Sequence, residues 1–207
     1  PYRLIEKVGK EEVNNRLDSI FTEARKSIFG GGKITYAFAG VESPYNHGNQ
    51  PSLHIPWLFN FSGKPYLTQK CLICDEFYGT NGEHGYGYGQ DEDQGQLGAW
   101  YVMAAMGLFD VQGGSCERPT FQIGSPLFDK IEIKLSPMNA TGKTFVIETT
   151  GNTPDAYYVQ SATLNGKPLE QCWMYRDELY KGGTLKLTMG NQPNEKWGVE
   201  NPPHCSE

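Results

Sequence analysis

The chain has 207 residues, a formal net charge of −6, 13% aromatic residues, 25 glycines and 13 prolines. This aromatic content is typical of a folded, loop-rich protein, because a disordered chain lacks the apolar surface that offsets the entropy lost on ordering. The negative charge and the scattered Lys and Arg residues exclude a nucleic-acid partner, and no apolar run is long enough for a membrane span. A neutral, polar ligand fits this composition better.

The first half of the chain, residues 1–114, is predicted to consist of helices separated by loops rich in Gly and Pro. Apolar residues recur there at the spacing of an amphipathic helix in three segments, and each stripe needs a packing partner. The stripes are Val13, Leu17, Ile20 and Phe21, then Leu67, Cys71, Cys74 and Tyr78, and last Leu97, Trp100, Tyr101, Ala104 and Leu108 within 95–109.

The second half, residues 115–207, is predicted to be a β module, because apolar and polar residues alternate with a period of two. Asn165-Gly166 predicts a hairpin with a type I′ turn, since both positions of that turn need a positive φ. We therefore predict an α+β protein with a helical part followed by an antiparallel β module. The alternating segments are 130–135, 144–149 and 184–190.

Two short patterns have limited functional weight. Cys71 and Cys74 form a lone C-x-x-C pair, but a zinc or redox site would need a second ligand pair or a βαβ context. We expect both cysteines on the buried face of a helix instead. The tripeptides 60–62 and 139–141 have the Asn-x-Ser/Thr pattern that accepts N-linked glycans in a eukaryotic secretory pathway.

The most unusual stretch spans residues 81–98, where glycines and tyrosines precede the consecutive acids Asp91, Glu92 and Asp93. Acids directly before a helix can simply stabilise its positive end. The glycines, however, allow a ligand to approach the backbone closely, and Tyr88 offers a flat ring for a sugar. Neighbouring carboxylates in such a loop suit general-base catalysis, because each tunes the pKa of the other.

Calcium binding is an alternative use of these acids. An EF-hand is excluded, because Gln94 and Gly95 come one position too early and no Glu stands at the twelfth position. A calcium ion held by oxygen atoms from separate loops stays open, because the ion accepts carboxylates, amide carbonyls and waters.

A second group of polar side chains lies at 45–57. The amide carbonyls of Asn49 and Gln50 could bind a hard cation, and His47 and His54 could bind substrate hydroxyl groups. The alternative is that these histidines are packed and hydrogen-bonded in the core, as histidines next to Pro and Trp often are.

Two long blocks are similar to signature sequences of glycoside hydrolase family 92. They read HGNQPSLHIPWLFNFSGKPYLTQK at 47–70 and GYGQDEDQGQLGAWYVMAAMGLF at 87–109. Members of that family are calcium-dependent exo-α-mannosidases that invert the anomeric centre and combine an N-terminal β-sandwich with an (α/α)6 barrel. The resemblance implies that residues 1–114 are an incomplete part of that barrel.

Position by position, the resemblance implies that Asp93 is the catalytic base and Asp91 its acidic companion. In an inverting glycosidase the base deprotonates a water, and the two carboxyl groups lie roughly 6.5–9.5 Å apart to leave room for it. It further implies substrate contacts and ligands for one Ca²⁺ ion. The substrate-binding residues are His54, His47, Glu92 and Tyr88, and the metal ligands are Asn49, Gln50 and Asp93.

The sequence departs from the family pattern at two positions. Gln50 stands where the family usually has Glu, and Leu53 stands where it usually has the first His of a pair that ends at His54. The family's general acid and β-sandwich lie upstream of any residue here, and the sequence does not begin with Met. We therefore expect the C-terminal portion of a longer enzyme that is secreted, periplasmic or on the cell surface.

The expected substrate is a glycan with terminal mannose in α-1,2 linkage, hydrolysed with inversion and with help from calcium. This chain would carry only the base side of the site, and its partners would be the missing β-sandwich and barrel half. The alternatives are a carbohydrate-binding protein without catalysis and an inactive truncated fragment.

Overall fold

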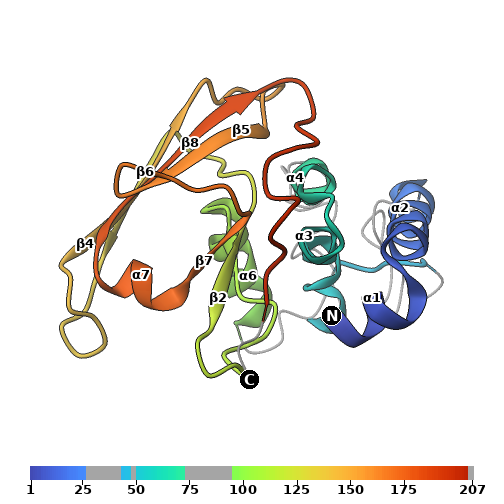
Figure 1. The fold of residues 1–207 in the computed structure, drawn as a ribbon, viewed down its shortest axis with the longest axis horizontal. Helices are drawn as coiled ribbons and strands as arrows, with labels where there is room; N and C mark the ends of the chain where they lie inside the picture. The colour runs from blue at the N-terminus through green and yellow to red at the C-terminus, as the bar shows by residue number, and fades with distance from the viewer. Residues whose placement is uncertain (27–42, 48–49, 73–94, 205–207) are drawn as a thin grey trace.

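The computed structural model describes residues 1–26, 43–47, 50–72 and 95–204. Helices precede strands along the chain, and Figure 1 shows the helices α1 to α4 and the large sheet on opposite sides of the molecule. The predicted α+β fold class is confirmed. The helices are α1 (Tyr2–Val8), α2 (Lys10–Lys26), α3 (Leu58–Ser62), α4 (Pro65–Leu72), α6 (Gln96–Ala105) and α7 (Arg176–Tyr180), with the 3-10 turns η2 (Gln50–Ser52) and η3 (Ile55–Trp57).

Helix α2 forms where the apolar stripe predicts it. Val13, Leu17 and Phe21 are buried, while acids occupy the first turn and basic residues the last, which favours the helix dipole. The second predicted helix is confirmed as α4, and Cys71 lies in it as expected. The remaining part of that stripe, Cys74 and Tyr78, lies outside the described residues.

The third predicted helix is α6, which is shorter than the predicted segment 95–109. It ends at Ala105, because Gly107 has a φ of 74° that a continuing helix cannot accommodate. The chain reverses there and Leu108–Phe109 form strand β1, which pairs with β2 (Thr120–Ile123). The prediction that Leu108 is helical was therefore wrong, although its burial was predicted correctly.

The strands form two sheets. A three-stranded sheet has the order β1-β2-β7, and a five-stranded sheet has the order β3-β4-β8-β5-β6. The remaining strands are β3 (Lys130–Lys134), β4 (Thr144–Thr150), β5 (Tyr158–Leu164), β6 (Lys167–Pro168), β7 (Trp173–Tyr175) and β8 (Gly183–Gly190).

The prediction of a wholly antiparallel module was wrong, because β4 and β8 are parallel, with Ile147 opposite Leu185. A parallel pair needs a long connection, and here the chain forms β5, β6, β7 and α7 between the two strands. Alternation within a strand shows which face is buried but not the direction of the neighbouring strand.

The predicted hairpin between β5 and β6 is confirmed. Asn165 and Gly166 have φ angles of 51° and 78°, as a type I′ turn requires. The Asn165 side chain also accepts a hydrogen bond of 2.8 Å from the backbone N–H of Thr184, which ties the turn to β8.

Two apolar cores lie side by side. One fills the space beneath the sheets and includes Ile123, Phe145 and Leu187, and the other lies among the helices and includes Phe21, Trp57 and Trp100. Buried polar side chains connect them. Gln69 of α4 accepts a 2.9 Å hydrogen bond from the Val159 N–H of β5, and Asn60 of α3 donates a 3.2 Å bond to the Ile123 carbonyl.

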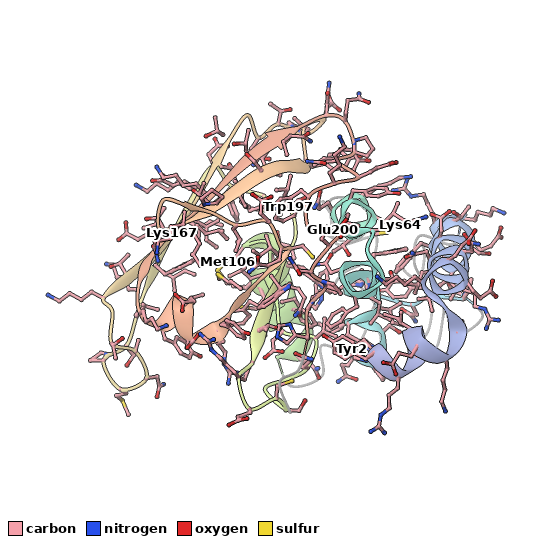
Figure 2. All side chains as sticks on the ribbon, viewed as in Figure 1. Tyr2, Lys64, Met106, Lys167, Trp197 and Glu200 are labelled. Carbon is pink, nitrogen blue, oxygen red and sulfur yellow. The ribbon has the colours of Figure 1, made fainter. Side chains whose placement is uncertain are left out.

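The C-terminal segment, residues 191–204, passes between the five-stranded sheet and the helices (Figure 1). The Trp197 indole donates a 2.8 Å hydrogen bond to the Leu169 carbonyl, and Figure 2 shows its ring between the sheet and α4. Gly198 has a φ of 77°, and a Cβ there would meet the Cys172 Cβ at 2.6 Å and the Pro65 ring at 3.2 Å. Position 198 therefore needs glycine, because the C-terminal segment passes closely between the five-stranded sheet and the helices there.

Replacing this glycine should destabilise the protein strongly. We expect Gly198→Ala to lower the free energy of unfolding by about 2–4 kcal/mol, because it combines a left-handed backbone with an overpacked contact. Gly113→Ala is the control, since Gly113 has a φ of 60° with open space around it and should cost about 1 kcal/mol. Equal urea-unfolding midpoints for the two variants would show that the close approach to Cys172 is unimportant.

Candidate active site

Of the predicted site residues, the structure describes His47, Gln50 and His54. All three lie on the short segment that leads through η2 and η3 into α3. The other predicted residues lie outside the described ranges, and their roles stay predictions. They are Asn49, Tyr88, Asp91, Glu92 and Asp93.

His47 is fully buried in the helical core. Its Nδ1 lies 2.7 Å from the Tyr45 hydroxyl, and its ring meets the Trp100 ring edge to face with centroids 4.2 Å apart. Burial lowers the pKa of His47 from 6.5 to about 3, because the core cannot solvate an imidazolium ion. His47 is therefore neutral at physiological pH, and the tautomer of its ring sets which of Nδ1 and the Tyr45 hydroxyl donates in their hydrogen bond.

Gln50 and His54 lie nearer the surface. Gln50 is half-buried at the first position of η2, and its side-chain amide makes no hydrogen bond to another residue that the structure describes. His54 is exposed at the start of η3. Partial desolvation lowers the pKa of His54. A hydrogen bond with the Pro51 backbone raises this pKa, but the effect of desolvation is larger. Both side chains are available to a ligand.

Trp100 of α6 joins this segment to the helix. Its indole N–H donates a 3.0 Å hydrogen bond to the Leu53 carbonyl, and its ring packs on His47. The side chain is 2% exposed, so this hydrogen bond is shielded from water. One residue therefore fixes both sides of the turn that carries Gln50.

The same helix follows directly after the acidic run in the sequence. Gly95 precedes α6 with a φ of 87°, and its carbonyl accepts the first helical hydrogen bond, from Ala99. Trp100 lies five residues further along, about 7.5 Å at the rise of an α-helix. The two sequence blocks singled out above thus meet at one helix, through a residue that the pattern analysis treated only as core.

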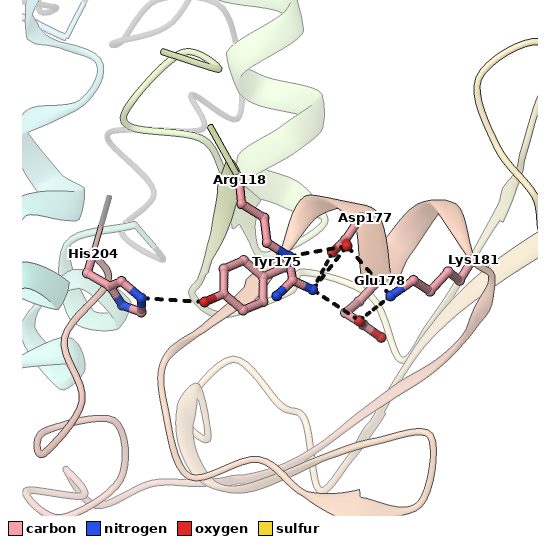
Figure 3. Close-up of polar contacts among 6 residues, drawn as sticks. All are labelled: Arg118, Tyr175, Asp177, Glu178, Lys181 and His204. Atoms are coloured by element: carbon pink, nitrogen blue, oxygen red, sulfur yellow. Dashed lines mark hydrogen bonds and ion pairs between the residues drawn. The ribbon is translucent and has the colours of Figure 1, made fainter. Parts of the chain in front are cut away.

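A second group of polar residues lies on the β side, around α7 (Figure 3). The Arg118 guanidinium stacks 3.5 Å above the Tyr175 ring and forms ion pairs with Asp177 and Glu178. Lys181 binds the same two acids, so the charges compensate each other within the group. We interpret it as a structural support for α7, of modest energy because its members are partly exposed.

The cysteines do not form a metal or redox centre in the part of the chain described. Cys116 is disulfide-bonded, and burial raises the pKa of the Cys172 thiol to about 12, which suppresses its reactivity. The described residues contain no group of three or more His, Cys, Asp or Glu able to hold a metal. They also contain no helix long and apolar enough to cross a membrane.

The comparison with known proteins decides the family. The model of the glycosyl hydrolase family 92 catalytic domain matches residues 1–191. The chain belongs to this family. The resemblance noted from the two sequence blocks is thereby confirmed.

Similar proteins agree with this assignment. The chain is 34% identical over 158 residues to an uncharacterized secreted glycosidase of Arthroderma benhamiae, covering 73% of this chain and 19% of that protein. It superposes on the family GH92 α-mannosidase BT3965 of Bacteroides thetaiotaomicron with a TM-score of 0.76 and 28% identity, over 97% of this chain. The inverting mannosidase BT2199 of the same organism gives a TM-score of 0.73 and 34% identity over 95% of this chain.

The chain is much shorter than these relatives. It covers 25% of BT3965 and 26% of BT2199. The 207 residues here therefore span about a quarter of the length of these two relatives.

The role of the hydrogen bond between Trp100 and the Leu53 carbonyl can be tested with a matched pair of variants. Trp100→Phe and Trp57→Phe each remove part of a buried indole from the helical core, but among the described residues Trp57 Nε1 has no hydrogen-bond partner. We expect Trp100→Phe to cost about 1–2 kcal/mol more, because it leaves the Leu53 carbonyl unsatisfied. Hydrogen exchange of residues 50–57 should accelerate only in Trp100→Phe. Equal losses of unfolding free energy and equal hydrogen-exchange rates in the two variants would contradict this role of Trp100.

Burial of His47 predicts acid sensitivity. The unfolded chain binds a proton at His47 below pH 6.5, whereas the folded protein does so only near pH 3. The contribution of His47 to the free energy of unfolding is therefore complete above pH 6.5 and is lost as the pH falls toward 3. At pH 5 this loss is about 2 kcal/mol. Urea unfolding at pH 7.5 and 5.0 measures this, and His47→Gln should lose that part of the pH dependence. An unchanged dependence would contradict a neutral buried His47.

Proposed function

We propose that this chain is the base-side portion of an enzyme that hydrolyses terminal α-mannosidic linkages in glycans. The observation that carries the proposal is the family match over residues 1–191. Within this range, Trp100 of α6 holds the segment that contains Gln50 and His54, through its hydrogen bond to the Leu53 carbonyl. The likeness to two mannosidases, one of them described as inverting, supports mannose as the sugar. Within this proposal the preferred linkage is α-1,2, and the anomeric centre is inverted.

In the proposed mechanism, Asp93 acts as the general base and takes a proton from the attacking water. Asp91 adds a second negative charge to the pair, which raises the pKa of one carboxylate and makes it basic enough to act at neutral pH. Glu92, Tyr88 and His54 would bind the sugar. The general acid that protonates the leaving oxygen comes from the upstream part of the enzyme, on the other side of the scissile bond.

The two histidines have different proposed roles. His54 is exposed and therefore suited to bind substrate hydroxyls. His47 was also predicted to bind substrate, but its burial and its contacts with Tyr45 and Trp100 favour a role in holding the segment in place.

Calcium fits the described part of the proposed site. The half-buried amide of Gln50 makes no hydrogen bond to the described residues, and amide oxygens are among the ligands that calcium prefers. Asn49 and Asp93 would complete the protein's share of the ligands. The ion, when bound, would polarise the hydroxyl groups of mannose and so favour the oxocarbenium-like transition state.

The chain would work only as part of a larger protein. We propose that residues 1–114 contribute helices to an (α/α)6 barrel completed by an upstream half, and that residues 115–207 form a C-terminal β module. An N-terminal β-sandwich would complete the enzyme. The secreted relative and the disulfide at Cys116 favour an extracellular or periplasmic location.

The decisive experiment follows hydrolysis of α-1,2-mannobiose by proton NMR, with this chain alone and with the chain joined to its upstream part. We expect β-mannose from the joined enzyme only, because the chain alone lacks the general acid. Excess chelator should abolish the reaction, and added calcium should restore it. Mannose release by the chain alone would place the acid within these 207 residues.

Asp93→Asn in the joined enzyme should lower kcat by about 10²–10⁴-fold with KM nearly unchanged, because a base acts in the transition state. Asp129→Asn changes an exposed acid of the β module in the same way and serves as the control. Glycan binding that persists without any turnover in the unmodified joined enzyme would favour a non-catalytic carbohydrate-binding protein.

A further inference from the structure

The two Asn-x-Ser/Thr tripeptides are equivalent as sequence patterns, but they have different environments in the structure. In the first, Asn60 is fully buried in α3 and its amide nitrogen donates to the Ile123 carbonyl at 3.2 Å. Ser62 is 3% exposed, and its hydroxyl bonds to the side chain of Asn14. The acceptor amide and the hydroxyl of this tripeptide are therefore both used inside the core.

The second tripeptide has the opposite environment. Asn139 and Thr141 are exposed, and neither the Asn139 amide nor the Thr141 hydroxyl makes a hydrogen bond to any residue within the described ranges. Backbone bonds hold both residues in the turn, and the Met138 N–H also donates to the Ser136 hydroxyl at 3.3 Å. Asn139 and Ala140 donate to the Ser136 carbonyl at 3.1 and 3.0 Å, and Thr141 donates to the Tyr180 carbonyl at 3.0 Å.

The tip of the turn, at Met138 and Asn139, is exposed to solvent. Met138 is 89% exposed, which is the highest value among the large apolar side chains described. The turn connects β3 to β4, and Figure 1 shows the loop that precedes β4 on the side of the sheet away from α1 to α4. A large substituent on Asn139 would therefore extend into solvent and leave the segment around His54 uncovered.

The disulfide at Cys116 agrees with passage of the chain through an oxidising compartment. Stable disulfides form in oxidising environments such as the lumen of the endoplasmic reticulum, where N-linked glycans are also added. A protein that gains this disulfide during secretion from a eukaryotic cell also meets the glycosylation machinery.

We propose that Asn139 is an N-glycosylation site and that Asn60 is not. The Asn139 Nδ2 forms a bond to the anomeric carbon of an oligosaccharide carried on a lipid diphosphate. The bond between that carbon and the diphosphate oxygen breaks, the lipid diphosphate leaves, and the amide nitrogen loses one proton. The proposal does not depend on mannoside hydrolysis.

A glycan on Asn60 is incompatible with the folded chain. Asn60 is fully buried, so a sugar on its amide nitrogen would have to occupy the core between α3 and β2, beside the Ile123 carbonyl. Folded molecules should therefore carry a glycan at residue 139 alone.

The test is expression of the chain behind a secretion leader in a eukaryotic cell, followed by glycopeptide mass spectrometry of the folded product. We expect one glycan, on Asn139, that peptide N-glycosidase removes. Asn139→Gln and Thr141→Val should lose it, whereas Thr141→Ser should keep it, because Ser retains the hydroxyl that the transferase recognises. All three changes lie on the exposed turn, so melting temperatures close to that of the unmodified chain verify that folding is intact.

Two outcomes would overturn the proposal. One is an unmodified Asn139 in folded protein recovered from the secretory pathway. The other is a glycan on Asn60 in a molecule whose melting is cooperative. Either result is independent of the mannobiose assay, so a failure here leaves the proposed hydrolysis unaffected.

Discussion

The buried contact of Trp100 is the interaction on which the proposed site depends most. The described residues between His47 and Trp57 form only two short 3-10 turns, which contribute few backbone hydrogen bonds to hold the segment in position. The indole supplies what is missing, with a hydrogen bond to the Leu53 carbonyl and a ring contact to His47. Because both contacts are shielded from water, they hold the turn that carries the half-buried Gln50 and that leads into the exposed His54.

The junction between the two cores follows the same principle. The helices and the sheets each bury apolar residues of their own, but the polar side chains of Asn60 and Gln69 make specific hydrogen bonds across the boundary. A buried hydrogen bond fixes orientation, whereas apolar contact alone tolerates sliding. The C-terminal segment adds a third connection through Trp197 and Gly198, where the close approach to Cys172 leaves no room for a side chain.

Local patterns predicted the elements that depend on local physics. The stripe of α2 and the Asn165-Gly166 turn are confirmed because helix periodicity and positive φ are properties of a few adjacent residues. The end of α6 was missed, since the chain turns at Gly107 to pair Leu108 with Ile123, fifteen residues further on in sequence (123 − 108). The short strands β2 and β7 were not predicted, and the strand at 184–190 was predicted without its parallel pairing to β4, because pairing depends on residues distant in the sequence.

The sequence by itself determined the family, through two long blocks whose order and spacing are specific, and it identified the residues proposed for catalysis. Tertiary structure alone decided what each side chain can reach. It placed His47 in the core and His54 at the surface, although the sequence presents both as polar neighbours of Pro and aromatic residues. It likewise buried Asn60 and exposed Asn139 within tripeptides of the same pattern. Burial is a property of the packed chain, because it depends on which distant segments cover a residue.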